Sequence, residues 1–158
     1  MRNRREAVSW SDDATLRVWD LDTGENQVLV GHTAPIVGAL LLNDGVHALS
    51  WCREEYVEND DSLRLWNLKT GCSKILQGHE GPVIGAVSFD DGKHVFSWSG
   101  NKTANIWDLE QATLASKFIG DDAICCCIGC HDKHRVIAGD KRGRVMVFST
   151  PGQEASMV

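Results

Sequence analysis

The sequence predicts an all-β fold built from repeated units of four short antiparallel strands. The first observation is that tryptophans recur at fixed distances along the 158 residues. The second is that short apolar or alternating runs fill each repeat, and the third is that turn-forming residues separate these runs, which is typical of strands. The tryptophans form two series with spacings of 41 and 47 residues: Trp10, Trp51 and Trp98, then Trp19, Trp66 and Trp107.

One insertion accounts for the two different spacings. Residues 9–13 align with residues 50–52 and 59–60, which leaves the six residues 53–58 without a counterpart. When these six residues are removed from the longer spacing of 47, the period becomes 41 throughout. The repeat is therefore regular, and the insertion lies between two strands of one unit.

The two central repeats each contain four candidate strands. Asn43-Asp44-Gly45 and Asp90-Asp91-Gly92 separate the first two strands of each repeat, and Thr70-Gly71 separates the last two strands of the earlier one. These are hairpin-forming sequences, because Asp, Asn and Gly tolerate the backbone angles that tight turns require. The predicted strands are 36–42, 47–52, 62–68 and 73–79, followed by 83–89, 94–99, 103–109 and 114–119.

Each end of the chain supplies three further strands. They show the same short apolar or alternating runs as the central repeats, so they are interpreted as incomplete units of the same kind. The predicted strands are 6–11, 15–21 and 26–31 near the N-terminus, and 123–130, 135–139 and 143–149 near the C-terminus.

Two Gly-His pairs, at residues 31–32 and 78–79, precede Trp-Asn and Trp-Asp within their repeats. This combination resembles the WD40 repeat family over nearly the whole chain, and in detail the WD-repeat proteins of bacteria. The resemblance implies a β-propeller in which each repeat forms one blade. The blades would be a partial blade at 1–31, complete blades at 32–79 and 80–120, and a partial last blade at 121–150, followed by a tail at 151–158.

About three and a half blades are too few to close a ring, because propellers have about four to eight. We therefore expect the chain to be the C-terminal part of a larger propeller. The alternative is that copies self-associate through their open blade edges into a ring. The resemblance implies a non-catalytic protein–protein interaction scaffold or sensor module, within a larger signalling protein, that binds protein partners and needs no cofactor.

The resemblance also implies a buried hydrogen-bond relay in each complete blade. A histidine, a hydroxyl, a carboxylate and an indole N–H each supply the donor or acceptor that the next group needs. In the blade at 32–79 these residues are His32, Ser50, Asp60 and Trp66. Because the same set recurs in successive blades, whereas an active site occurs once, we interpret it as structural and not as a hydrolase triad.

The other blades carry incomplete versions of this relay. The blade at 80–120 has Asn101 in place of the carboxylate, the first blade lacks the histidine, and the last has Asp121 and Phe148 in place of the histidine and the tryptophan. The remaining relay residues are His79, Ser97 and Trp107 in the blade at 80–120, and Ser9, Asp13 and Trp19 in the first blade. We expect the last blade to have no relay.

Four cysteines and two histidines gather near residues 125–134. Their spacing resembles the ligand patterns of zinc and of covalent haem, so a metal-binding protein is the alternative function. Its ligands would be Cys127, Cys130, His131 and His134. The argument against a metal site is that the run falls on a predicted strand, where small buried cysteines suit core packing. Alternation would place Cys125 and Cys127 on one face and Cys126 on the other, so the run would not converge on one ion.

The insertion at 53–58 is the candidate protein-binding loop, because insertions on a rigid scaffold often carry function. It presents three carboxylates and one aromatic anchor, which suit a basic partner: Glu54, Glu55, Tyr56 and Glu58. A solvated loop without a partner is the alternative reading.

The charge and the apolar content of the chain indicate which other classes of partner are not expected. The formal net charge is −6, and the basic residues are scattered along the chain, so nucleic acid is not an expected partner. No run approaches 18 apolar residues, and the first residues lack the apolar segment of an export signal, so neither a membrane partner nor export is expected. We therefore expect a cytoplasmic protein whose six cysteines are free thiols.

Overall fold

The computed structural model describes residues 5–52, 62–130 and 134–150. This part of the chain is all-β, with four antiparallel sheets of three or four strands and one short 3-10 helix. In each sheet, every strand pairs with the strand that precedes or follows it in the sequence. No helix in the described ranges is long and apolar enough to cross a membrane.

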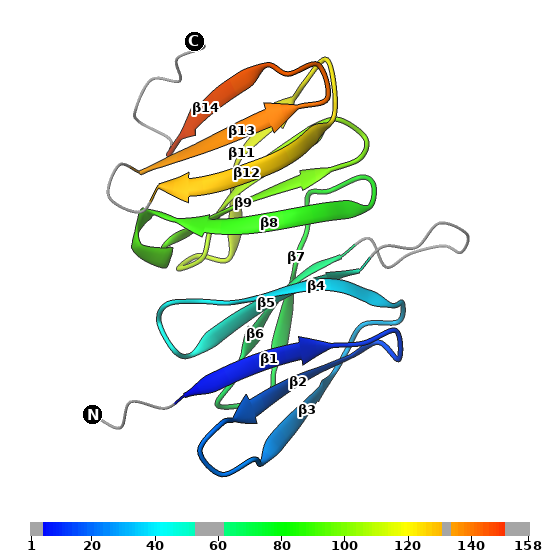
Figure 1. The fold of residues 1–158 in the computed structure, drawn as a ribbon, viewed down its shortest axis with the longest axis vertical. Coiled ribbons are helices and arrows are strands. Elements are labelled where there is room, and N and C mark those ends of the chain that lie inside the picture. Colours follow the sequence, from blue (N-terminus) through cyan, green and yellow to red (C-terminus); the bar gives the residue numbers. More distant parts are fainter. Residues whose placement is uncertain (1–4, 53–61, 131–133, 151–158) are drawn as a thin grey trace. The chain divides into compact units, whose positions relative to one another are not determined.

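The first compact unit covers residues 1–75 and holds the first two sheets (Figure 1). The first sheet has the strand order β1-β2-β3 and the second the order β4-β5-β6-β7, whose last strand runs to the start of the next unit. Their bounds are β1 Glu6–Trp10, β2 Thr15–Asp20, β3 Asn26–Val30, β4 Ile36–Leu41, β5 His47–Cys52, β6 Leu63–Asn67 and β7 Ser73–Leu76.

The second compact unit covers residues 76–158 and holds the other two sheets. The third sheet has the order β8-β9-β10-β11 and the fourth the order β12-β13-β14. Their bounds are β8 Val83–Phe89, η1 Asp90–Gly92, β9 His94–Ser99, β10 Thr103–Asp108, β11 Thr113–Ile119, β12 Ile124–Cys130, β13 Arg135–Asp140 and β14 Val145–Ser149.

Every strand predicted from the sequence is confirmed, with small differences at the ends. The largest difference is in β7, which ends at Leu76 and not at residue 79. Gly78 has a φ of 157°, outside the range that L residues in a strand adopt, so the extended chain stops before it. The all-β class and its antiparallel units are therefore confirmed, whereas the closure of these sheets into a propeller stays a prediction.

Each sheet has two distinct faces, which we name by the relay residues. The relay face carries the relay serine and tryptophan, or the residues at their positions, and the back face carries the alternate side chains. Register places Ser50 and Trp66 on the relay face of the second sheet, because Ser50 pairs with Arg64, two residues before Trp66. In the fourth sheet Ala138 and Phe148 hold the equivalent positions.

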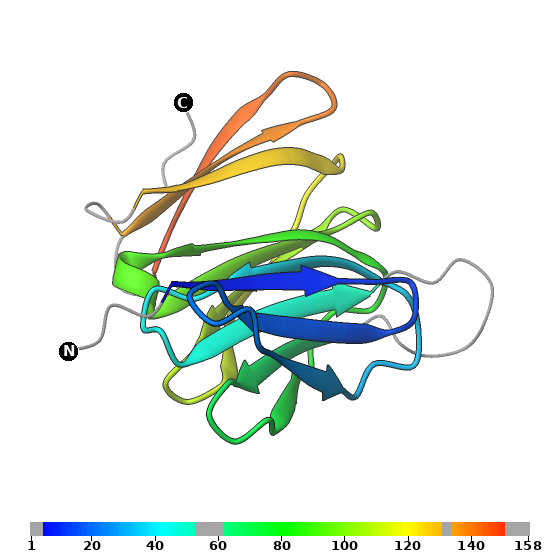
Figure 2. The same ribbon diagram turned by 60° about the horizontal axis from the view of Figure 1, so that its bottom comes forward.

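In both units, a back face packs against the relay face of the next sheet. In the first unit, Leu16 and Leu29 of the first sheet share a core with Ala48 and Trp66 of the second. In the second unit, where Figure 2 shows the fourth sheet lying over the third, the shared core consists of Phe89, Phe96, Trp98, Ala104, Ile106, Ile124, Val136, Ala138 and Phe148. Full burial of each large apolar side chain contributes about 1.5–3 kcal/mol, so this stacking supplies most of the stability of each unit.

A β-bulge recurs at the same place in three sheets, near the start of the first strand. In the second and third sheets a glycine follows the bulge, and a tryptophan of the neighbouring strand covers it. A Cβ at Gly38 would lie 2.2 Å from the ring of Trp51, and one at Gly85 would lie 2.4 Å from the ring of Trp98. Only glycine lets the indole lie flat on the strand.

We predict that Gly85→Ala destabilises the second unit by about 1–3 kcal/mol, because the added Cβ forces the buried Trp98 ring out of its packing. Urea unfolding followed by tryptophan fluorescence measures the change. Gly100→Ala is the matched control: its Cβ would meet only the end of the Ile84 side chain, at 3.3 Å, so its effect should stay below about 0.5 kcal/mol. Equal unfolding midpoints for the two variants would contradict this account of the glycine.

Candidate functional site

A hydrogen bond between a tryptophan indole and a serine hydroxyl recurs in the first three sheets. In each case the tryptophan Nε1 donates to the Oγ of a serine on the neighbouring strand. The N–O distances are 2.8 Å for Trp19 and Ser9, 2.8 Å for Trp66 and Ser50, and 2.7 Å for Trp107 and Ser97. The predicted hydroxyl and indole members of the relay therefore lie together in these sheets.

In the second sheet the relay histidine joins this pair. His32 is buried, and its Nε2 lies 2.7 Å from Ser50 Oγ. The opposite ring nitrogen, Nδ1, lies 3.3 Å from Cys52 Sγ and 3.4 Å from Ser62 Oγ. Asp60, the predicted carboxylate, lies outside the described residues.

In the third sheet, Asn101 holds the position of the predicted carboxylate. His79 Nε2 lies 2.6 Å from Ser97 Oγ, as in the second sheet. Asn101 does not reach the histidine, because its Oδ1 accepts hydrogen bonds from the backbone N and the Oγ1 of Thr103 at 3.1 and 2.6 Å. His79 Nδ1 is therefore buried without a hydrogen-bond partner in the described part of the chain.

This environment favours the neutral form of His79. Burial lowers the pKa of its imidazole to about 4, and the positive charge of Lys117 adds to the effect. Asp13, the carboxylate predicted for the first sheet, accepts hydrogen bonds from the backbone N and the Oγ1 of Thr15 at 2.9 and 2.7 Å. Both Asn101 and Asp13 thus shape the turn between two strands.

The relay hydroxyls are enclosed. Ser50 and Ser97 are 0% exposed, and each Oγ already contacts both an imidazole and an indole N–H. A nucleophile has to reach a substrate atom, and these oxygens cannot reach one without unfolding of the sheet around them. The geometry suits a structural role, in which each hydroxyl joins a strand to the segment that precedes the sheet.

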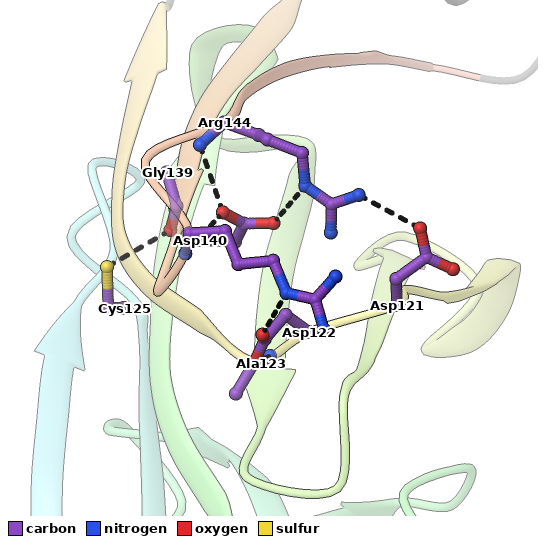
Figure 3. Close-up of polar contacts among 8 residues, drawn as sticks. Asp121, Asp122, Ala123, Cys125, Gly139, Asp140 and Arg144 are labelled. Carbon is purple, nitrogen blue, oxygen red and sulfur yellow. Dashed lines mark hydrogen bonds and ion pairs between the residues drawn. The ribbon is translucent and has the colours of Figure 1, made fainter.

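In the fourth sheet a cluster of charged residues takes the place of the relay (Figure 3). Arg144 lies between two carboxylates: its Nε donates to Asp140 Oδ2 at 2.7 Å and its Nη1 to Asp121 Oδ2 at 2.9 Å. Arg142 Nε donates to Asp122 Oδ2 at 2.9 Å. The cluster joins the turn between β13 and β14 to the segment before β12, as the histidine relays do in the second and third sheets.

Asp140 is the centre of this cluster, and its side chain is fully buried. Burial by itself would raise the pKa of Asp140, but hydrogen bonds from the backbone and guanidinium of Arg144 and the backbone of Arg142 hold it below the ordinary value. Sequence reasoning missed the cluster, although it did place Asp121 at the histidine position. The signal was the charged turn at residues 140–144, in which three cations follow one carboxylate.

The cysteines do not share one environment, and the predicted alternation is wrong at Cys125. A bulge between Ile124 and Cys126 adds one residue to β12, so Cys126 pairs with Gly139 and Cys127 with Ala138. Cys127 packs on the core, and burial raises the pKa of its thiol to about 12. Cys125 and Cys126 are exposed, so core packing describes Cys127 but not these two.

The two other described metal-ligand candidates, Cys130 and His134, do not join Cys127 in one cluster. His134 Nδ1 forms a hydrogen bond with Asp90 Oδ1, and His94 Nδ1 lies 2.8 Å from the other oxygen of the same carboxylate. Burial alone would raise the pKa of Asp90, but these two imidazoles lower it. Cys130 is half-buried, and His131 lies outside the described residues. Within the described ranges, no three His, Cys, Asp or Glu side chains are close enough to hold a metal ion.

The predicted contact loop is also outside the described residues, which omit 53–61. This applies to all four of its candidate residues: Glu54, Glu55, Tyr56 and Glu58.

The exposed apolar surface of the fourth sheet is a candidate that the sequence pattern did not single out. Its back face presents Ile128, Ile137 and Val145, which are 63%, 39% and 52% exposed. The equivalent face of the third sheet is covered by the fourth sheet, whereas this one is open. Adjacent exposed apolar side chains of this kind mark interaction surfaces.

Comparison with known proteins gives no further assignment. No protein-family model matches the chain, and a search of curated proteins finds no match either.

We predict that Ser97→Ala destabilises the protein by about 1–3 kcal/mol, because it leaves the buried Trp107 N–H and a nitrogen of His79 without a partner. Ser9→Ala is the matched control. Its bond with Trp19 is only partly buried, so water can replace the hydroxyl and the loss should be smaller. Urea unfolding compares the two variants. A loss for Ser9→Ala as large as that for Ser97→Ala would show that burial does not set the cost.

We predict that His79 makes the protein less stable as the pH falls from about 6.5 towards about 4. In this window the unfolded chain protonates the imidazole and the folded chain does not, so the proton stabilises the unfolded state. The slope is at most about 1.4 kcal/mol per pH unit. Unfolding midpoints measured across this window should fall more steeply for the unmodified protein than for His79→Gln, which cannot be protonated. If the unfolding midpoints of the two proteins fell in parallel with pH, the lowered pKa of His79 would be contradicted.

Proposed function

We propose that this chain is a non-catalytic protein-interaction module of the WD40 repeat type, acting as a scaffold or sensor within a larger signalling protein. Three observations support this. The 41-residue period corresponds to four sheets of one topology, the serine–tryptophan bond recurs in three of them, and the relay hydroxyls are enclosed. A scaffold of repeated sheets presents loops and faces to partners and needs no reactive centre.

The observation that carries the proposal is the open back face of the fourth sheet. Each unit of this chain repeats one interface, in which a back face packs on the relay face of the next sheet. The fourth sheet offers a further back face of the same apolar kind, with Ile128 and Val145 more than half exposed. Burial of these side chains by a partner would gain the free energy that the equivalent residues gain inside the chain.

A second copy of this chain is the partner to which we commit, so that the module assembles with itself. The back face of the fourth sheet needs a relay face, and the first sheet presents one. Trp19 and Ser9 lie on it, and its strand β3 exposes Val28 and Val30 to 43% and 73%. Contact between these two faces would join copies head to tail, which closes a ring or extends a chain according to the rotation at each step.

We predict that the molar mass in solution rises with protein concentration, and that Ile128→Lys combined with Ile137→Lys weakens this association about tenfold or more. Light scattering after gel filtration, over a range of concentrations, measures the mass. Ile75→Lys is the control, because Ile75 is an exposed apolar residue of β7 in the second sheet and so belongs to neither of the two faces proposed to meet.

A monomeric mass over the whole range would contradict self-association and assign the face to another protein. A lysine pair that leaves association unchanged would show that copies meet elsewhere.

A further inference from the structure

The exposed thiols of Cys125 and Cys126 border the back face of the fourth sheet, and they differ from every other cysteine of the described chain. They are consecutive, both exposed and placed at a bulge. The bulged positions of the other sheets hold Val37 and Ile84, which are also exposed, so this part of the repeat turns the side chain at the bulge away from the core.

Both sulfur atoms lie beside one glycine of the neighbouring strand. Cys125 Sγ is 3.3 Å from the carbonyl oxygen of Gly139, as Figure 3 shows. Cys126 Sγ occupies the space above the same residue, only 2.9 Å from the point where a Cβ of Gly139 would be. Because both sulfur atoms lie beside Gly139, the two thiols are neighbours. The pair is therefore a local dithiol and not two independent cysteines.

Partial loss of water around the sulfur, and then the hydrogen bond and charge of Cys126, raise the pKa of Cys125. A neighbouring thiolate has this effect, because two negatively charged sulfurs side by side repel each other.

The fourth sheet reverses the arrangement that covers this place elsewhere. The second and third sheets put glycine after the bulge and a large indole opposite it, whereas the fourth puts Cys126 after the bulge and Gly139 opposite it. No indole covers the strand here. A shallow groove of about 260 Å³ remains next to Cys126, lined by Ile128, Ile137 and Val145 among others. The dithiol thus lies at the edge of an apolar groove.

We infer that Cys125 and Cys126 form a binding site for trivalent arsenicals that carry one apolar substituent. Arsenic(III) is a soft, thiophilic centre, and soft ligands such as thiolates select soft centres. Two thiols react with an arsonous acid, R–As(OH)2: two S–As bonds form, two As–O bonds break, and the two thiol protons leave with the hydroxyl groups as two waters. No atom changes its oxidation state. The substituent R lies in the groove.

The affinity for the arsenical comes from the adjacency of the two thiols. After the first S–As bond forms, the second thiol is already a neighbour, so closure is intramolecular and proceeds at a high effective concentration. An exposed single thiol, such as Cys72, can form only one such bond and releases the arsenical readily. The consecutive pair should therefore bind at least about 100-fold more tightly than a single cysteine.

The test uses phenylarsine oxide, which hydrates to an arsonous acid, with the full chain and intact-mass spectrometry. We expect one tightly held equivalent that 2,3-dimercaptopropanol removes and 2-mercaptoethanol does not. Cys125→Ser and Cys126→Ser should each weaken binding about 100-fold or more, whereas the controls Cys72→Ser and Cys130→Ser should leave it unchanged. Circular dichroism checks that each variant keeps its strands.

Unchanged retention in either serine variant at 125 or 126, or an adduct located by peptide analysis at Cys127 or Cys130, would overturn the site. The groove has its own test: the phenyl compound should dissociate more slowly than the methyl compound, and Ile137→Ser should reduce that difference. Equal dissociation rates for the two compounds would overturn the role of the groove. These readouts are taken at a protein concentration at which the chain is monomeric, because the groove belongs to the back face proposed for self-association, and a failure of self-association would leave them intact.

Discussion

Stacking of one sheet on the next is the constraint on which the rest of this structure depends. A three- or four-stranded sheet of short strands cannot bury enough apolar surface alone, so each back face needs the relay face of a neighbour. This explains why the largest buried side chains of the second unit, such as Phe89 and Phe96, share one core with Phe148 of another sheet. It also explains why the uncovered back face of the fourth sheet is the surface that we propose for self-association.

The serine–tryptophan bonds make this stacking compatible with polar side chains in the interior. Trp66 and Trp107 are almost fully buried, and an indole N–H without an acceptor would oppose their burial. The serine hydroxyl supplies that acceptor and at the same time holds the histidine of the preceding segment. Where the fourth sheet has Ala138 and Phe148 in these positions, no such bond is possible, and the charged cluster around Asp140 joins the same two segments.

Departures from the repeat therefore identify the positions that are free to do something else. His79 Nδ1 has no hydrogen-bond partner among the described residues, which gives the third sheet a group that responds to acid. The exchange of Gly and Trp for Cys126 and Gly139 opens a groove and exposes two thiols. Both changes lie within a pattern of strand pairing that repeats along the chain, so they alter local chemistry without altering the fold.

The sequence by itself determined the strands and the period, because these depend on local patterns: alternation, turn residues and fixed spacing. The serine–tryptophan pairs were expected only from the resemblance to a repeat family. The sequence did not determine the faces of Cys125 and Cys126, because alternation counts residues and a bulge adds one. Gly38 and Gly85 marked that bulge in the other sheets, but the fourth sheet has cysteine at this position and the signal is lost. The contact between His134 and Asp90 and the cluster around Arg144 were likewise decided by tertiary structure. They join segments that are distant in the sequence, and only the packing of the strands brings their charges together.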